Sequence, residues 1–296
     1  MKSRYEINEN KRKKEKSIKK KSFLKKLLFI LIGILLILGI WGKFVEPNLL
    51  TVKEYNIKND NIPNSFNGVK IIQFSDLHYG IGNGEKKLTN IVNKINNLNP
   101  DVVVFTGDLI DKNYEISDND LKTITKLLSK IESKLGKYAC FGNHDSKNES
   151  FENIMYDSGF KLLKNNFDTI YNKVNTPIVI YGLDDSLEGN PNISALGGKE
   201  INDIPYKIVI MHEPDYIDEF IDNYDVNLVL AGHSHNGQVK LPGIRPIYLP
   251  KGAKTYYGNS YNINETMFYI SNGVGNSIID FRLFNTPSIN LFRLAN

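Results

Sequence analysis

The segment VNLVLAGHSH, residues 226–235, joins a strand-length apolar run to two histidines one residue apart. Its Val and Leu residues are typical of a buried β-strand. Gly232 and Gly237 place the histidines inside a glycine-bounded turn. Because side chains two residues apart at a strand end point to one side, His233 and His235 are expected to project into one cleft.

The same form recurs along the chain. Short runs rich in Val, Ile, Phe and Tyr predict strands at 69–76, 102–108, 137–145, 177–185, 206–213, 226–235 and 267–273. Between them, residues 85–98 and 120–135 space their apolar side chains at three and four, which predicts amphipathic helices, the second capped at Ser117 or Asp118. This alternation indicates an α/β layered domain with largely buried strands.

Polar side chains collect where these strands stop, which is where ligand sites form in open α/β sheets. Each of these polar residues, taken alone, has an ordinary explanation, such as a capping aspartate or a surface histidine. The repetition of such residues at five strand ends favours one shared site instead. The candidates are Asp76, His78, Asp108, Asn143, His144, His212, His233 and His235.

The N-terminal part has a different character. Residues 27–41 (LLFILIGILLILGIW) contain no charged or polar side chain except the Trp41 indole, and their flanks extend the apolar stretch towards the ~30 Å core of a bilayer. We expect a transmembrane signal-anchor over 23–45. A cleaved signal peptide is the alternative, but no A-x-A-like site follows Trp41.

Charge sets the expected orientation. Residues 1–26 hold 12 Lys and Arg against three Glu, a net charge of +9, whereas the remainder holds 25 basic against 30 acidic residues, a net charge of −5. The positive-inside rule predicts a basic cytoplasmic tail over 1–22, a linker over 46–62 and a globular domain over 63–296 on the extracytoplasmic side of the cell membrane. A mildly acidic domain gives no reason to expect nucleic acid as a partner. The single cysteine, Cys140, excludes an internal disulfide.

The blocks DLH (76–78), GDLID (107–111), GNHD (142–145), MHEP (211–214) and GHSHNGQ (232–238) resemble, in order, those of the calcineurin-like metallophosphoesterase superfamily. Together they extend over most of residues 67–283. The segments 241–259 and 268–277, with the N-terminal anchor, are similar to the bacterial membrane-associated subgroup. The resemblance implies an α/β fold of the four-layer αββα sandwich type with two adjacent divalent metal ions.

The resemblance also implies roles. Asp76, His78, Asp108 and His235 would hold one metal ion, while Asp108, Asn143, His212 and His233 would hold the other, with Asp108 bridging. A metal-bridging hydroxide would attack the phosphate, and His144 would assist the leaving group. Asp111 and Asp145 would orient these residues, although ordinary turn positions are an alternative for both. The mixed imidazole and carboxylate ligands suit Mn, Fe, Zn or Co, with Mn favoured.

One departure concerns the substrate. Where related proteins of the subgroup often carry Arg before the glycine loop, this chain reads SNGVG at 271–275. Lys240, Arg245, Lys251 and Lys254 in the preceding loop are candidates to supply charge for a phosphate, and solvated surface positions are the alternative for them. We expect hydrolysis of a phosphate ester or diphosphate, with a lipid-linked or cell-envelope phosphate as one candidate. The alternatives are a phosphodiesterase of soluble nucleotides and a catalytically silent binding module, against which the retained His144 argues.

Overall fold

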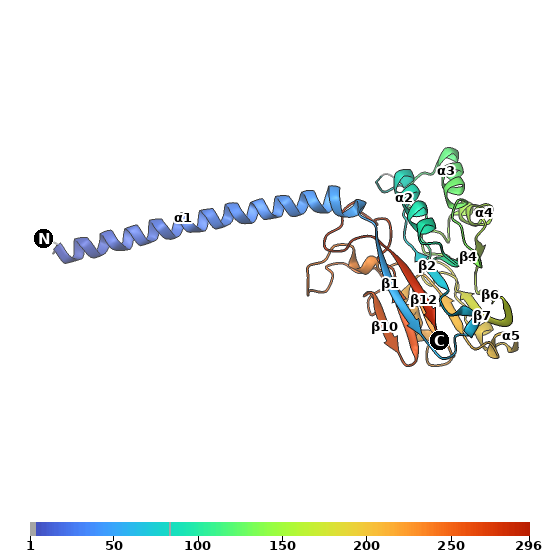
Figure 1. Ribbon diagram of the computed structural model, residues 1–296. Helices are drawn as coiled ribbons and strands as arrows, with labels where there is room; N and C mark the ends of the chain where they lie inside the picture. Colours follow the sequence, from blue (N-terminus) through green and yellow to red (C-terminus); the bar gives the residue numbers. More distant parts are fainter. Residues whose placement is uncertain (1–3, 83) are drawn as a thin grey trace.

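Two six-stranded sheets face each other in the computed structural model, which describes residues 4–82 and 84–296 (Figure 1). The first sheet has the order β1 (Thr51–Lys58), β12 (Ser288–Ala295), β2 (Lys70–Phe74), β3 (Val102–Phe105), β4 (Gly136–Ala139), β5 (Lys161–Leu162). The second has the order β10 (Ser260–Ile263), β11 (Thr266–Ile270), β9 (Leu228–Ala231), β8 (Lys207–Ile210), β7 (Val174–Gly182), β6 (Asn166–Asn172). Parallel pairing runs through β2, β3, β4 and β5, and through β7, β8, β9 and β11.

Helices cover the outer face of each sheet. The first sheet carries α2 (Gly84–Asn97), α3 (Asp118–Leu128) and α4 (Glu149–Asp157). The second carries α5 (Lys199–Asn202) and the 3-10 turns η4 (Ser194–Gly197) and η5 (Pro214–Glu219). These layers give the expected four-layer αββα arrangement.

Alternation along the strands divides the core into three layers. In β2, Ile72 and Phe74 are buried against the helices, while Ile71 lies in the cluster between the two sheets. In β8, Val209 is buried with Phe220, which follows η5, in the third apolar layer, between the second sheet and its covering helices. A strand with both faces buried reads as a continuous apolar run, which explains why the central strands were visible in the sequence.

Most of the predicted elements are present, with two differences at their limits. The helix expected over 120–135 ends at Leu128. Ile131 is nevertheless buried, so the apolar spacing that predicted further helix comes from an irregular segment that also packs into the core. Its N-cap is Ser117, which forms a reciprocal capping box with Asp120. The predicted linker, 46–62, contains strand β1, which pairs in parallel with β12 along its whole length and so belongs to the first sheet.

The N-terminal helix α1 (Arg4–Ile40) leaves the domain as a long rod (Figure 1). It is followed by a π-turn, η1 (Trp41–Val45), and a 3-10 turn, η2 (Glu46–Asn48). By length and composition this helical stretch is the one among the described residues able to cross a membrane, and none of its apolar window is buried against the domain. The apolar helix expected over 23–45 is therefore present, and it is continuous with the basic segment before it.

Candidate metal centre

Loops at the carboxyl ends of strands bring together all the polar residues that the sequence singled out. Asp76 and His78 follow β2, Asp108 follows β3, and Asn143 and His144 follow β4. From the second sheet, His212 follows β8, and His233 and His235 follow β9. The two sheets thus contribute to one site where their parallel strands end.

Several of these residues have left-handed backbones, which non-glycine residues seldom adopt. The φ angle is +55° at Asp76, +45° at His78, +61° at Asp108, +65° at His233 and +47° at His235. Such conformations cost about 1–3 kcal/mol each and persist where the surrounding structure enforces them, most often at functional sites. The sequence motifs therefore encode turns that aim these side chains.

Asp76, His78 and His235 form the first cluster of ligand atoms. His78 Nε2 lies 3.0 Å from His235 Nε2, and His235 Nε2 lies 3.4 Å from Asp76 Oδ1. The Asp76 carboxylate is held in place by the backbone N–H of His233, which donates to Oδ1 at 3.0 Å. Asp108 Oδ2 lies 3.5 Å from His78 Nε2 and so borders this cluster.

The second cluster consists of Asp108, His212 and His233. Asp108 Oδ2 lies 3.2 Å from His212 Nε2, and His212 Nε2 lies 3.2 Å from His233 Nδ1. Asp108 therefore borders both clusters. Burial would raise the pKa of Asp108, but His212, His144 and His78 hold it well below its usual value. In turn the Asp108 carboxylate raises the pKa of His212 well above normal, against the effect of burial.

Hydrogen bonds on the far sides of two rings fix their tautomers. His212 Nδ1 donates to the Thr106 carbonyl at 2.7 Å, and His233 Nε2 donates to the Lys251 carbonyl at 2.8 Å. Since a carbonyl only accepts, each ring directs its other nitrogen, His212 Nε2 or His233 Nδ1, to the second cluster. The raised pKa of His212 places a proton on its Nε2, 3.2 Å from Asp108 Oδ2, and a bound cation would take the place of that proton.

Asn143 adds an acceptor that lacks a partner. Its Oδ1 is buried and has no hydrogen-bond donor among the described residues, although buried polar groups are normally paired. Asn143 lines the same cavity as His78 and Asp108. An amide oxygen in this position suits a metal ion, because it ligates without adding negative charge.

The carboxylate of Asp145 does not face the clusters. It accepts hydrogen bonds from the backbone N–H groups of Asp108 at 2.7 Å, Leu109 at 2.9 Å and Gly142 at 3.0 Å. It therefore fixes the loops after β3 and β4 against each other. Burial raises its pKa to about 7, and the Asp108 charge acts in the same direction.

Asp111 lies between two histidines. Its Oδ2 is 3.6 Å from His78 Nδ1 and 3.5 Å from His144 Nδ1. The His78 imidazole lowers the pKa of Asp111 to about 2, so the carboxylate stays charged.

The His144 side chain lines the cavity, and with His78 and Asp108 it forms a third group of neighbouring ligand atoms. Its Nδ1 accepts a hydrogen bond from the backbone N–H of Lys112 at 3.1 Å, so in the neutral ring the proton is on Nε2. That Nε2 lies 4.0 Å from Asp108 Oδ2 and is turned inward. Burial lowers the pKa of His144 to about 4, which favours the neutral ring as a hydrogen-bond donor.

The two glycines of the GHSHNGQ motif have different roles. A Cβ atom at Gly232 would lie 2.2 Å from Ser75 Oγ and 2.9 Å from Asp76 Oδ2, so close approach to the site requires glycine there. At Gly237 a Cβ atom would meet the Pro246 ring, and φ is +80°. Gly237 thus serves the turn rather than approach to the clusters.

The buried Arg282 is a site residue that the sequence gave no reason to select. It is fully buried, and its Nη2 donates to the Asn272 carbonyl at 2.9 Å and lies 3.3 Å from His235 Nδ1. Burial, His78 and Arg282 together lower the pKa of His235 well below normal, which keeps its ring neutral. Related proteins often carry an arginine before this loop, whereas in this chain Arg282 follows the SNGVG loop in the sequence. Its buried guanidinium donates hydrogen bonds to the loop carbonyls of Asn272 and Gly275.

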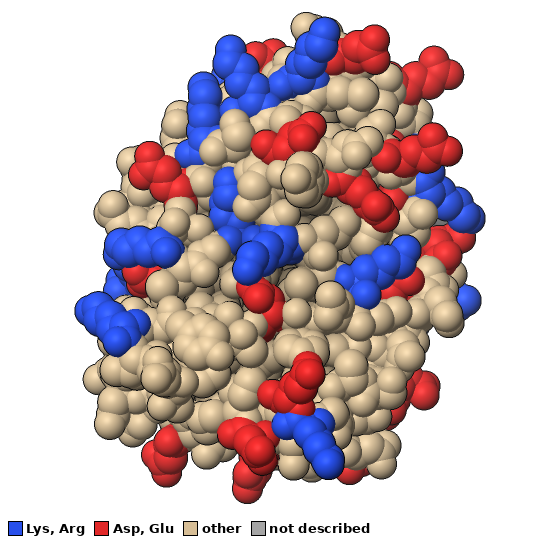
Figure 2. Space-filling model, turned by 90° about the vertical axis from the view of Figure 1, so that its right-hand side faces the viewer, with Lys and Arg blue, Asp and Glu red and all other residues tan. Residues whose placement is uncertain are grey.

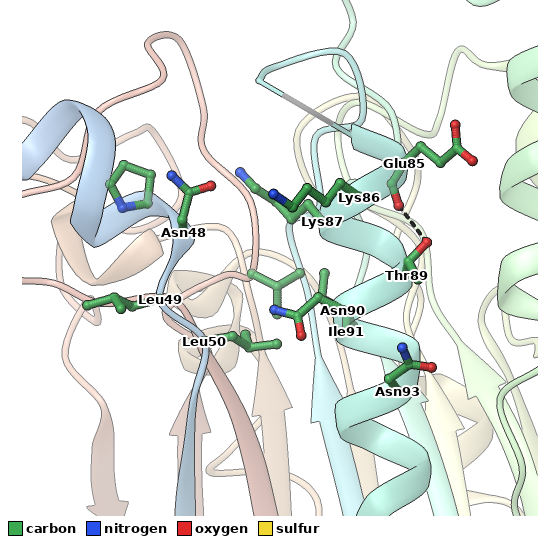
Figure 3. A pocket seen from close by; sticks show the side chains of 12 residues that line it. Asn48, Leu49, Leu50, Glu85, Lys86, Lys87, Thr89, Asn90, Ile91 and Asn93 are labelled. Atoms are coloured by element: carbon green, nitrogen blue, oxygen red, sulfur yellow. Dashed lines mark hydrogen bonds between the residues drawn. The ribbon is translucent and has the colours of Figure 1, made fainter.

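The clusters open into a cavity of about 640 Å³, a size usual for ligand sites. Lys112 is among its lining residues, whereas Lys240, Arg245, Lys251 and Lys254, which the sequence suggested as phosphate contacts, are not in the described lining. A cavity of about 790 Å³ lies elsewhere, between the segment after the anchor and α2 (Figure 3). Its described lining holds none of the candidate residues, so cavity size alone does not locate the site.

Fold and site together define a metal-binding α/β sandwich, and comparison with known proteins gives its family. The family model of the calcineurin-like phosphoesterases matches residues 69–237. The chain is 33% identical over 259 residues to an uncharacterized metallophosphoesterase, YkuE, of Bacillus subtilis, covering 86% of this chain and 89% of that protein. This chain belongs to the calcineurin-like phosphoesterase family and is a phosphoric ester hydrolase.

Two more distant relatives are informative. A transmembrane protein with metallophosphoesterase domain from Danio rerio is 28% identical over 293 residues, covering 94% of this chain and 64% of that protein. The UDP-2,3-diacylglucosamine pyrophosphatase LpxG of Chlamydia trachomatis is 28% identical over 251 residues, covering 69% of this chain and 74% of that protein.

Proposed function

We propose that this protein is a membrane-anchored, dinuclear metal-dependent phosphoesterase that hydrolyses a phosphate ester or diphosphate at the membrane. The observation that carries the proposal is the second cluster, where His212 Nε2 and His233 Nδ1 converge with Asp108 in a buried position, each ring being held from its far side by a backbone carbonyl. Without a metal, a proton on His212 Nε2 pairs with Asp108, as the raised pKa of His212 indicates, and a divalent cation would replace that proton and use all three atoms as ligands.

The donor set fits two ions. Asp76, His78, Asp108 and His235 would hold one, and Asp108, Asn143, His212 and His233 the other, with Asp108 shared as its place beside both clusters suggests. The unpaired Asn143 Oδ1 supports the second set. When bound, two adjacent divalent ions supply positive charge for the phosphate and an activated water as nucleophile.

The remaining residues prepare the site for this reaction. Asp145 holds the two loops that carry Asp108 and Asn143 in register. His144 presents Nε2–H to the cavity and can donate a hydrogen bond to the leaving-group oxygen, where negative charge develops as the ester bond breaks. Lys112 lines the same cavity and supplies a cation for the rest of an anionic substrate.

The membrane anchor determines on which side of the membrane the site meets its substrate. We propose that α1 spans the membrane once with its basic end in the cytoplasm, following the charge distribution, and that residues 46–296 lie outside. A relative named for a diacylated nucleotide sugar, with its diphosphate bond, supports a lipid-linked diphosphate as the substrate class. Manganese is the proposed ion, since mixed imidazole and carboxylate ligands suit it.

The test is hydrolysis by the full-length protein in detergent after metal removal and reloading. We expect activity on bis-nitrophenyl phosphate to return with Mn²⁺, and Asp108→Asn to abolish it. Asp157→Asn, an exposed carboxylate on α4, is the matched control and should behave as wild type. Absence of any metal-dependent hydrolysis, on this substrate and on a lipid-linked diphosphate, would make the protein a silent binding module instead. Preference for cyclic or linear nucleotides over lipid substrates would favour a soluble-nucleotide phosphodiesterase.

A further inference from the structure

The loops after β9 and β11 expose large apolar side chains around the mouth of the site. We call Leu241, Ile244, Ile247, Tyr248, Ile278 and Ile279 the apolar rim. Ile247 is 85% exposed and Ile278 is 72% exposed. Ile247, Tyr248, Ile278 and Ile279 also line the cavity that contains the clusters. Exposing this much apolar surface is costly in water, so such patches usually mark a contact with another apolar phase or partner.

The two loops of the rim are tied together by Gln238, from the GHSHNGQ motif. Its Nε2 donates to the carbonyls of Ser277 at 3.0 Å, Ile279 at 3.1 Å and Phe281 at 3.1 Å. Its Oε1 accepts from the backbone N–H of Ser277 at 2.7 Å. One side chain beside the site therefore links the start of the loop after β9 to the loop after β11.

The end of the membrane anchor is bound to the same loops. Lys43 Nζ contacts the Asp280 carbonyl at 3.0 Å and its carboxylate at 3.1 Å, and the Arg282 N–H donates to the Gly42 carbonyl at 2.9 Å. A Cβ atom at Gly42 would lie 2.4 Å from the Phe281 ring, so the two segments pack in direct contact. The rim is thus continuous with the point where α1 reaches the domain.

Glu46 completes this junction. It is buried, accepts the backbone N–H of Phe284 at 2.9 Å and of Asn285 at 2.5 Å, and accepts the Trp41 indole N–H at 3.0 Å. A side chain at the end of the anchor therefore satisfies backbone groups of the rim loop. The anchor is docked against the domain rather than joined to it by a free tether.

Opposite faces of the domain differ in character. In Figure 1 the orange-brown loops between β9 and β10 project on the side from which α1 leaves. Figure 2 shows the face turned away from α1, where Lys, Arg, Asp and Glu are scattered over the surface. A charged distal face with an apolar anchor-side rim is the polarity of a protein lying on a membrane.

We propose that the apolar rim inserts into the boundary between headgroups and acyl chains of the bilayer that α1 crosses, so that the site opens onto the membrane surface. The site then takes the phosphate of an amphiphile whose apolar part remains in the leaflet. This second step rests on the proposed phosphoesterase function, whereas rim insertion rests on the anchor and on the loops alone.

Depth measurement tests rim insertion without any assay of activity. The full chain, reconstituted in phospholipid vesicles, carries a nitroxide at Ile244→Cys or Ile247→Cys; Cys140 is buried and can stay. Tyr156→Cys on α4, 81% exposed, is the control on an exposed surface far from the rim. We expect rim labels to be relaxed more by oxygen than by a water-soluble nickel complex, and the Tyr156 label to show the reverse. Rim labels as accessible to nickel as the control would overturn the proposal, and spin–spin broadening that disappears on dilution of labelled chains would assign the rim to a second copy instead.

Activity tests the second step. Ile244 lies outside the described lining of the cavity, so Ile244→Asp should leave kcat/KM for a water-soluble aryl phosphate within about 2-fold of wild type. It should lower kcat/KM for a vesicle-embedded phosphate amphiphile about 10-fold or more, because a charged carboxylate replaces an apolar side chain that would contact the leaflet. Tyr156→Asp should alter neither. Equal loss on both substrates would overturn the assigned role of Ile244, and a wild type inactive on both would refute the phosphoesterase proposal while leaving the depth result intact.

Discussion

Replacing His144 with Ala separates the chemistry from metal binding. In the structure its Nδ1 accepts the Lys112 N–H at 3.1 Å, so the ring presents Nε2–H to the cavity. The variant removes this donor while leaving Asp76, Asp108, His212 and His235 in place. The exposed Lys112 N–H can bond to water instead, so we expect unfolding free energy to fall by only about 1 kcal/mol.

The expected kinetic effect follows from the donor that is lost. Removing one hydrogen-bond donor to a developing oxyanion typically costs about 10²–10³ in rate, which corresponds to roughly 2.7–4 kcal/mol at about 1.36 kcal/mol for each tenfold change. The loss should be large for an alkyl phosphate ester, because negative charge concentrates on its leaving oxygen as the ester bond breaks. It should be small for a nitrophenyl ester, whose leaving group departs as a stable anion.

The assay combines elemental analysis with kcat on both esters. His144→Ala should retain the metal content of wild type and show the leaving-group dependence. His212→Ala is the contrast, and should lose metal and activity on both esters, because its Nε2 belongs to the second cluster. A His144→Ala protein that loses a metal equivalent, or that is equally impaired on both esters, would refute the assignment of His144 as the leaving-group donor.

Four further outcomes are expected. Gly232→Ala should lower metal occupancy, because its Cβ would lie 2.9 Å from Asp76 Oδ2. Gly197→Ala is the control, since its Cβ would make an ordinary 3.4 Å contact with the Tyr224 ring. Equal metal occupancy of the two variants by elemental analysis would contradict this. Asp145→Asn should lower unfolding free energy by about 1.5–3 kcal/mol, since one charge-assisted backbone bond is lost, and an unchanged urea midpoint would refute it. Removing the metal with EDTA should lower Tm, with about 2.7 kcal/mol regained at a Mn²⁺ concentration of about 100 times Kd, and Asp108→Asn should show no such shift. Protease added to intact protoplasts should remove residues beyond the anchor and spare the basic tail; full protection of the domain, with the tail accessible only after lysis, would reverse the proposed orientation.

Strand ends made the site predictable from the sequence. Because parallel strands buried on both faces appear as short apolar runs, their carboxyl ends could be located, and the residues there meet in the structure. Strand β1 was not predicted because its residues are mostly exposed or half-buried, and only Ile57 is buried. A strand so polar resembles a linker until its partner β12 is known.

Contacts that no local sequence pattern marks account for what the sequence did not reveal. Arg282 reaches the loop at 272–275 because a return of the chain buries its side chain there, and no local motif marks that return. Glu46 likewise satisfies backbone groups at Phe284 and Asn285, across most of the chain's length. Lys240, Arg245, Lys251 and Lys254 are not in the described cavity lining, and exposed loop residues carry no sequence pattern that indicates which way their side chains point.

Metal content of the full-length protein tests the central claim most directly. After loading with Mn²⁺ and removal of unbound ions, elemental analysis should give about two manganese ions per chain in wild type. Asp108→Asn should bind markedly less, because Asp108 borders both clusters, while Asp157→Asn should match wild type. A wild-type protein that binds at most one ion, or an Asp108→Asn protein that still binds two, would contradict a dinuclear centre built around Asp108.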